Sequence, residues 1–189
     1  MGYKVITPAA PVVTLEEVRL HLRLNTDAIG GTHPDDPLLS ALILSAMQYC
    51  EHGTGRAIGT QTVEIALDAF PEGAISLPKG PLQSVTSLTY TDASGAAQTL
   101  SSALYAVDDY GLQPWVLAKV NTGWPAANAS ANSVRVRYVA GSKEPALIAA
   151  VLLMVGHLYE NREASSSVQT YELPVGVKAL LNTCKVWGI

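Results

Sequence analysis

The chain has 189 residues, of which 48% are hydrophobic and 15% are charged, and its formal net charge is -4. This length suffices for one hydrophobic core, or for one core with a small subdomain, and excludes a typical two-domain enzyme. The apolar content excludes a disordered chain, and the negative charge excludes a global positive field that would attract nucleic acid. The low share of charged residues also indicates that part of the apolar surface contacts a partner.

A first short helix is predicted to begin after residue 14. Thr14 and Glu17 have the spacing of a capping box, and Val13 and Val18 have the spacing of a hydrophobic staple. Residues 25–37, which contain paired glycines and paired aspartates, are predicted to form a polar loop that leads to a second helix.

The second helix is predicted over residues 36–52, and Gly53 and Gly55 indicate its end. One large hydrophobe, Leu44, lies among the polar residues of the opposite arc, where it is either an ordinary exposed side chain or a contact with a partner. The predicted buried arc consists of Leu38, Leu39, Leu42, Ile43, Ala46, Met47, Tyr49 and Cys50.

Between residues 60 and 138 the hydrophobic period changes to two, which is typical of short strands. Gly-rich and Pro-rich segments separate these strands, so we expect a small, mainly antiparallel β region. Arg135 and Arg137 have the spacing of one strand face, and a solvated face is a better interpretation than a nucleic-acid-binding patch.

Helix is predicted again from Pro145 to about Glu163, and a last helix from Leu173 onward. The serine-rich segment 164–172 between them has no periodicity and is predicted to be a mobile loop. The first of these two helices has a large apolar arc and a second side of smaller residues, so it can be packed between two neighbours. The second side consists of Ala149, Ala150, Leu153, Gly156 and His157.

These elements predict an α+β fold, in which helices from both ends of the chain form a core and a small, mainly antiparallel β region is inserted between them. We expect a single domain over 1–189, with N-terminal helices in 1–56, the β insertion in 57–141 and C-terminal helices in 142–189. The two cysteines lie on separate helical patterns and are expected to be buried thiols. No signal peptide or membrane span is expected, so the protein is predicted to be made in the cytoplasm.

The patterns that could carry chemistry are weak. His157 and Glu160 have a spacing that suits a metal site, but the other helices offer no further inward ligands. Cys50 and His52 are two residues apart on a helix and therefore do not face each other as a nucleophile and its base. Gly53 and Gly55 lack the third glycine and the preceding strand of a dinucleotide site.

Two acidic pairs also have ordinary structural explanations. Asp35 and Asp36 are expected to stabilise a helix N-terminus, and Asp108 and Asp109 are expected to lie in a solvated turn. We therefore expect no catalytic residue, no cofactor and no metal.

Several short motifs, taken in order, resemble those of phage and prophage head-tail connector proteins, also called adaptors. No single motif is diagnostic, but their order and spacing cover almost the whole chain. They are residues 5–8, 15–17, 21–23, 54–56, 77–81, 84–85, 124–125, 134–138 with Gly141, 158–163, and 173–177 with Leu180 and Leu181.

The resemblance implies a structural virion protein whose copies form a ring, commonly of twelve, docked under the portal protein at the head-tail junction. It also implies a surface for the next neck or tail-completion protein, and a central passage for DNA without sequence-specific binding. The family supplies no catalytic residues. The long β insertion departs from the shorter, nearly all-helical connectors.

We expect partner contacts at two kinds of position. Some are apolar residues in excess of what the core needs, and the others belong to two of the family-like motifs. These are Leu44, Ala149, Leu153, Gly156, Arg162 and Leu173. One alternative is a tail-completion or baseplate subunit with the same assembly chemistry. Another is a small hydrolase or ligand-binding domain with a pocket lined by Asp108, Asp109, Tyr110 and Trp115.

Overall fold

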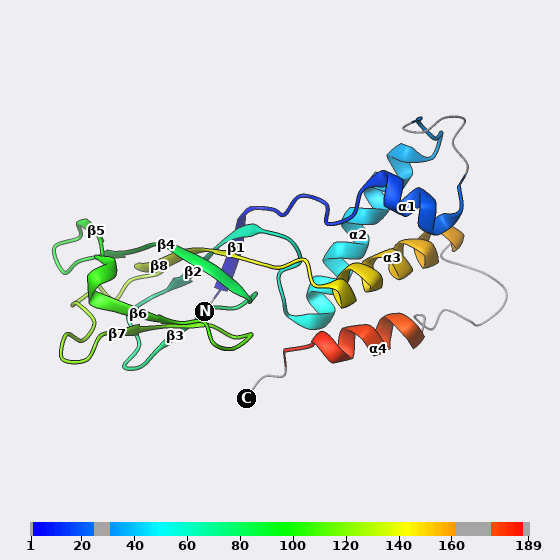
Figure 1. Ribbon diagram of the computed structural model, residues 1–189. Helices are drawn as coiled ribbons and strands as arrows, with labels where there is room; N and C mark the ends of the chain where they lie inside the picture. Colours follow the sequence, from blue (N-terminus) through cyan, green and yellow to red (C-terminus); the bar gives the residue numbers. More distant parts are fainter. Residues whose placement is uncertain (1, 25–30, 162–174, 187–189) are drawn as a thin grey trace. The chain divides into compact units, whose positions relative to one another are not determined.

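The computed structural model describes residues 2–24, 31–161 and 175–186, and combines helices with antiparallel sheets (Figure 1), which confirms the predicted α+β class. The chain forms two compact units, each made of two segments. Residues 1–10 and 55–142 form the β unit, and residues 11–54 and 143–189 form the helical unit.

The β unit contains a five-stranded, fully antiparallel sheet that we call the large sheet. Its strands lie in the order β1 (Gly2–Thr7), β2 (Gln61–Leu67), β8 (Val134–Ala140), β4 (Leu82–Thr91) and β5 (Ala97–Thr99). Strand β1 was not predicted, since residues 1–56 were expected to contribute only helices. It forms because Tyr3 and Val5 continue the alternation of β2 across the register, opposite Ile65 and Val63.

A smaller antiparallel sheet of three strands completes the β unit. Its order is β3 (Ile75–Ser76), β7 (Trp115–Ala118) and β6 (Tyr105–Asp108), and a 3-10 turn, η1 (Ser102–Leu104), precedes β6. In Figure 1 the strands β3, β6 and β7 lie together on one side of β2, β4 and β8. The short strands explain why hydrophobic alternation alone did not separate this sheet from its turns.

The core of the β unit lies between the two sheets. Val63, Ile65 and Val136 of the large sheet share one buried cluster with Ile75 and Val116 of the small sheet. Arg135 and Arg137, which flank Val136 in β8, are exposed, as the two-residue period predicted. Burial of each large aliphatic side chain contributes about 1.5–3 kcal/mol, so this alternation fixes which face of the large sheet is covered.

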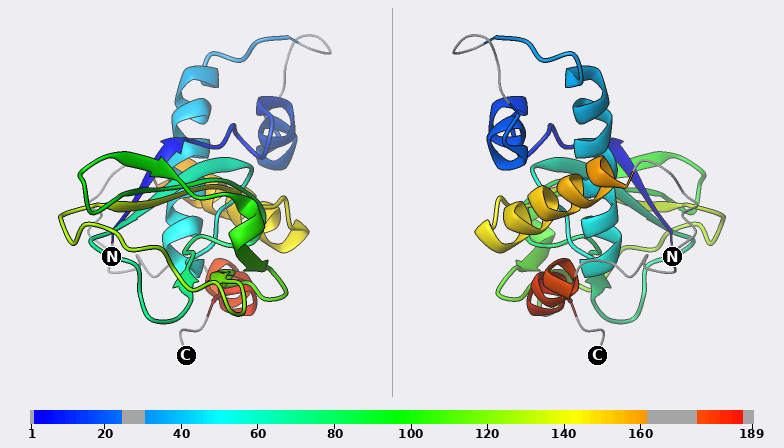
Figure 2. Two further views of the ribbon diagram at one scale, coloured as in Figure 1. Left: turned by 90° about the vertical axis from the view of Figure 1, so that its left-hand side faces the viewer. Right: turned by 90° about the vertical axis from the view of Figure 1, so that its right-hand side faces the viewer.

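The helical unit consists of α1 (Leu15–Leu22), α2 (Asp36–Thr54), α3 (Pro145–Glu160) and α4 (Val175–Cys184). Helix α3 contacts each of the other three helices, and Figure 2 shows it crossing α2. Thr14 caps α1 as predicted: its hydroxyl accepts from the Glu17 amide, and the Glu17 carboxylate accepts from the Thr14 amide at 2.7 Å. These bonds satisfy two amides that the helix itself leaves without partners.

The core of the helical unit agrees with the predicted arcs except at two positions. Ala150, which was expected on the small side of α3, is fully buried beside Val151. Tyr49, which was expected in the buried arc of α2, is 38% exposed because its angular position lies at the edge of that arc. The buried residues of α2 are Leu39, Ile43, Ala46, Met47, Cys50 and Thr54.

Two helix ends differ from the predicted ones. Helix α2 continues through Gly53 to Thr54, two residues beyond the predicted His52, and Gly55 has φ +71°, the left-handed conformation typical of a residue that follows a helix. Helix α3 ends at Glu160, before the predicted end near Glu163. Pro145 lies in the first turn of α3. The predicted mobile loop 164–172 and the start of the last helix at Leu173 lie outside the described residues.

Candidate functional site: assembly surfaces

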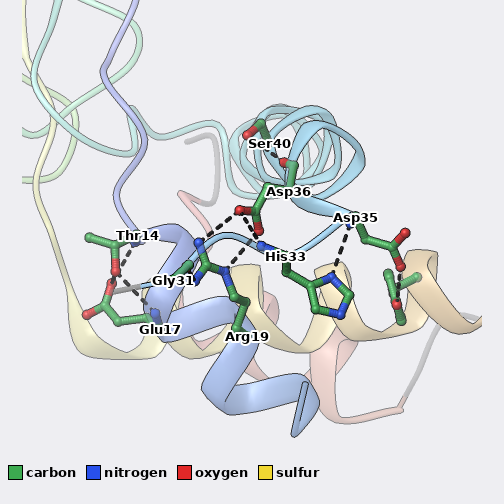
Figure 3. A network of polar contacts seen from close by, with 9 residues as sticks. Thr14, Glu17, Arg19, Gly31, His33, Asp35, Asp36 and Ser40 are labelled. Atoms are coloured by element: carbon green, nitrogen blue, oxygen red, sulfur yellow. Dashed lines mark hydrogen bonds and ion pairs between the residues drawn. The ribbon is translucent and has the colours of Figure 1, made fainter. Parts of the chain in front are cut away.

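A polar network fixes the start of α2 to α1 (Figure 3). Arg19 of α1 donates to both carboxylate oxygens of Asp36, at 2.9 and 3.0 Å, and to the Gly31 carbonyl at 2.6 Å. The side chains of Arg19 and Asp36 are only 13% and 15% exposed. A bidentate pair of this kind defines direction as well as distance, so it orients the residues that enter α2.

The same network reaches α3. The Asp35 amide donates to Nδ1 of His33 at 3.1 Å, and the hydroxyl of Tyr159 in α3 donates to the Asp35 carboxylate at 2.5 Å. Sequence alone placed Asp35 and Asp36 at a helix N-terminus, and Asp36 does lie in the first turn of α2. Their partners Arg19 and Tyr159 were not predicted, because they lie 17 and 124 residues away.

The outward side of α2 carries no charged residue between Asp36 and Glu51. Leu44 lies at its centre and is 53% exposed. The exposed residues of this stretch, which we call the α2 face, are Pro37, Ser40, Ala41, Leu44, Ser45, Gln48 and Tyr49. A long helical surface without charge is unusual for a solvated helix and is typical of a surface that another molecule covers.

A second uncharged stripe, which we call the α3 stripe, runs along Ala149, Leu153 and Gly156. Leu153 is 38% exposed. A Cβ at Gly156 would lie 3.6 Å from the His21 ring of α1, an ordinary van der Waals distance, so this end of the stripe faces α1 within the helical unit. Two further residues predicted to contact a partner, Arg162 and Leu173, lie outside the described residues.

The Cys50 and His52 side chains do not form a catalytic pair. Cys50 is fully buried, and desolvation raises the pKa of its thiol to about 11. His52 is exposed, and its Nδ1 lies 2.7 Å from the Gln48 carbonyl. Burial therefore keeps the thiol protonated at neutral pH, which is opposite to what a nucleophile requires.

Other candidate groups are also placed away from reactive arrangements. Among the described residues, no group of three or more His, Cys, Asp or Glu side chains is arranged to hold a metal ion. The His157 ring and carbonyl contact the side chain of Asn161, the residue that follows α3. Asp108 accepts from the Tyr110 amide at 3.2 Å in an exposed turn.

The described residues contain a groove of about 370 Å³ on the β unit, and Asp108, Asp109, Tyr110 and Trp115 do not line it. Its walls come from β1, β2, β8 and the turn before β8. They consist of Gly2, Tyr3, Lys4, Glu64, Ala66, Asn132 and Arg135.

No described helix has the length and hydropathy needed to cross a membrane.

The described residues thus combine an α+β fold with two uncharged helix faces, a geometry suited to contacts with other molecules. Residues 12–106 match the family described as phage gp6-like head-tail connector protein. The chain belongs to this family, which confirms the resemblance found in the sequence motifs, and its role is that of a structural head-tail connector.

Solved structures similar to this chain come from gene transfer agent (GTA) particles. A chain of the native GTA virion is 23% identical with a TM-score of 0.81, and a chain of the neck of the empty particle, computed with C6 symmetry, is 24% identical with a TM-score of 0.79. A chain of the native neck, computed with C12 symmetry, is 22% identical with a TM-score of 0.76. Each comparison covers 100% of this chain and 97% of the other, so the likeness of fold includes the β unit. No curated protein matches the sequence.

Proposed function

We propose that this connector forms a ring of about twelve copies under the portal protein, in the neck of a virion. The ring gives DNA a passage and gives the next neck or tail-completion protein a surface on which to dock. The observation that carries this proposal is the family match over residues 12–106. The fold shared with chains of GTA necks, one computed with C12 symmetry, supports the ring and its place in the particle.

A ring of identical subunits needs two different surfaces that fit each other, because each copy contacts one neighbour on each side. The α2 face and the part of the α3 stripe around the exposed Leu153 are two candidate surfaces of this kind on the helical unit. Both lack charge, and each carries one exposed leucine, Leu44 and Leu153. Removing these side chains from water between copies would stabilise every contact around the ring.

The distribution of charge supports passage rather than binding of DNA. The helical unit contains six Lys and Arg residues against ten Asp and Glu residues, whereas the β unit contains six of each. A negative surface near the passage would not hold phosphates, so DNA could move past it during packaging and ejection.

Native mass spectrometry of the chain, alone and mixed with purified portal protein, tests the proposal. We expect a closed ring of about twelve copies that co-purifies with portal. Binding to tail tube instead of portal would identify a tail-completion subunit. A chain that forms no ring with either component would contradict the connector ring.

A further inference from the structure

The groove on the β unit lies on the outer face of the large sheet. The register places Lys4 opposite Glu64, and Ala66 opposite Arg135, on the face that alternates with the buried residues. The volume of about 370 Å³ falls in the range of about 300–1,000 Å³ that is typical of small-molecule pockets. The groove can therefore accept one large side chain.

The groove has an excess of positive charge. Glu64 is its carboxylate, and Arg137 neutralises it through an ion pair of 2.7 Å. Arg135 donates to the Asn132 carbonyl at 3.3 Å and pairs with no carboxylate among the described residues. Lys4 is exposed on the edge strand β1. Two cations of this groove are thus available to an acidic partner.

The hairpin that joins β6 to β7 has the opposite character. Its tip carries Asp108, Asp109 and Tyr110, all exposed, and Tyr110 has a relative exposure of 103%. The Asp108 carboxylate accepts from the Tyr110 amide, which holds the turn. A tyrosine so completely exposed, directly after two carboxylates, leaves a large apolar ring in water.

Exposed hydrophobic side chains gather around this hairpin. Six of them lie within residues 104–120, a segment that also contains Asp108, Asp109 and Lys119 as its charged residues. They are Leu104, Val107, Tyr110, Leu112, Leu117 and Val120. A concentration of this kind is typical of an interaction surface.

The hairpin and the groove belong to opposite sides of the large sheet. The small sheet, which includes the hairpin, shares a buried cluster with the inner face, whereas Lys4 and Arg135 lie on the outer face. The tip of a chain therefore does not enter the groove of the same chain. Two complementary surfaces on opposite sides are what a head-to-tail contact between copies requires.

We propose that the β6–β7 hairpin of one copy docks in the groove of the next copy. Tyr110 fills the groove, and Asp108 and Asp109 pair with Lys4 and Arg135 of the neighbour. A second copy of this chain is the occupant because it presents two carboxylates to two cations, and one exposed ring to one groove. This contact rests on the proposed ring and adds a β-unit contact to the one made by the helical unit.

A charge exchange tests the pairing. The groove variant carries Lys4→Glu and Arg135→Glu, and the hairpin variant carries Asp108→Lys and Asp109→Lys. Each variant alone presents like charges across the contact, so its self-association in sedimentation velocity is expected to weaken by about tenfold or more. A 1:1 mixture restores opposite charges at every contact, with the two variants alternating, and is expected to recover wild-type association.

A control reverses a charge elsewhere on the β unit. Glu72 is exposed and belongs to neither the groove nor the segment 104–120. The variant with Glu72→Lys is expected to associate as the wild type does. Circular dichroism of all variants checks that they fold.

Cross-linking identifies the occupant directly. Tyr110→Cys in one copy and Ala66→Cys in another are expected to form a disulfide on oxidation, since the native Cys50 and Cys184 are buried. The bond is expected only when both variants are present. In a third arm, duplex DNA is added before oxidation. If the groove bound phosphates instead, DNA would occupy it and lower the yield of the cross-link.

Three results would overturn the proposal: no cross-link at about 1 mM protein, unchanged association of the groove variant, or a mixture that fails to recover. Displacement of the cross-link by DNA would assign the groove to nucleic acid. If each charge variant forms normal rings on portal, the contact between hairpin and groove is ruled out, whereas the proposed connector function is not affected. Absence of rings from the wild type would instead contradict the proposed function.

Discussion

The two units place their charges differently. The β unit is neutral and distributes its ionic groups over strand faces and turns, such as Arg137 paired with Glu64 at 45% and 19% side-chain exposure. The helical unit has the whole net charge of -4, yet residues 37–50 and 145–159 contain no Asp, Glu, Lys or Arg. Its charges lie at helix ends and in the connections between helices.

This difference shows how a helical unit can be acidic and still offer surfaces for assembly. Carboxylates at helix starts interact with the helix dipole and with partners such as Arg19, while the sides of α2 and α3 remain uncharged. In the β unit, charged residues such as Lys4 and Arg135 lie on the outer face of the large sheet, within the surface that a partner would contact. We therefore expect hydrophobic contacts through the helical unit and salt-dependent contacts through the β unit.

The largest effect is expected from Val151→Asp, which places a carboxylate among fully buried residues of α3. An unpaired buried charge costs several kcal/mol against a total stability of about 5–15 kcal/mol. The variant is expected to lose cooperative thermal unfolding of its helical signal in circular dichroism. Leu153→Asp, two residues away and partly exposed, is the control and is expected to melt normally; equal damage from both would show that the core is misplaced.

Next in size is the effect of Leu44→Lys on assembly. The side chain is half exposed, so the melting temperature of the free subunit is expected to stay within about two degrees of the wild type. Ring formation on portal is expected to fall, since a loss of about 1–2 kcal/mol recurs at every contact. Electron microscopy of the complexes measures it.

The control for that variant is Leu20→Lys, because Leu20 is 79% exposed on α1, outside the α2 face. It is expected to form rings normally. Normal rings from Leu44→Lys would remove the α2 face from the interface, and an unfolded Leu44→Lys protein would return Leu44 to the core.

A smaller difference is expected between the ion pairs of the two units. Double-mutant cycles with Arg19→Met and Asp36→Asn, measured by denaturant unfolding, are expected to give about 1–3 kcal/mol, because the pair is bidentate and largely buried. The exposed pair Arg137 and Glu64 is expected to give about 0–1 kcal/mol. Equal coupling energies would contradict the view that the two units use charge differently.

The smallest effect concerns Asp92 in the turn between β4 and β5. Hydrogen bonds from Ser94, Gln98 and Ala96 lower the pKa of its carboxyl from 3.8 to about 2. A lowered pKa means that the ionised form stabilises the turn above pH 3.8, and that this contribution is lost as the pH falls through about 2. The amide shifts of Ser94 and Ala96 in NMR are expected to titrate in that window, and Asp92→Asn is expected to abolish the titration.

The sequence predicted the features that depend on neighbouring residues. The capping box of Thr14 and Glu17 and the outward arginines of β8 follow from spacing within one element. The position of Leu44 on the exposed arc of α2 was also predictable, because a helix fixes the angle of each side chain. Whether Leu44 contacts a partner stays a prediction.

Strand β1 is exposed at every residue, so its hydrophobic pattern was too weak to distinguish it from a loop. The burial of Ala150 could not be predicted, because a small side chain is placed by the distance of the opposing helix and not by its own hydrophobicity. Both errors concern contacts with other segments of the chain.

The sequence by itself determined where the helices begin, that the middle of the chain forms short strands, most of the apolar arcs, and the family, since these are recorded in local spacing and motif order. Only the tertiary structure decided which distant groups meet, such as Tyr159 with Asp35, Arg19 with Asp36, and the β1 and β8 residues that line one groove. The physical reason is that periodicity fixes the direction of a side chain within its element, whereas its partner depends on how elements far apart in the chain pack together.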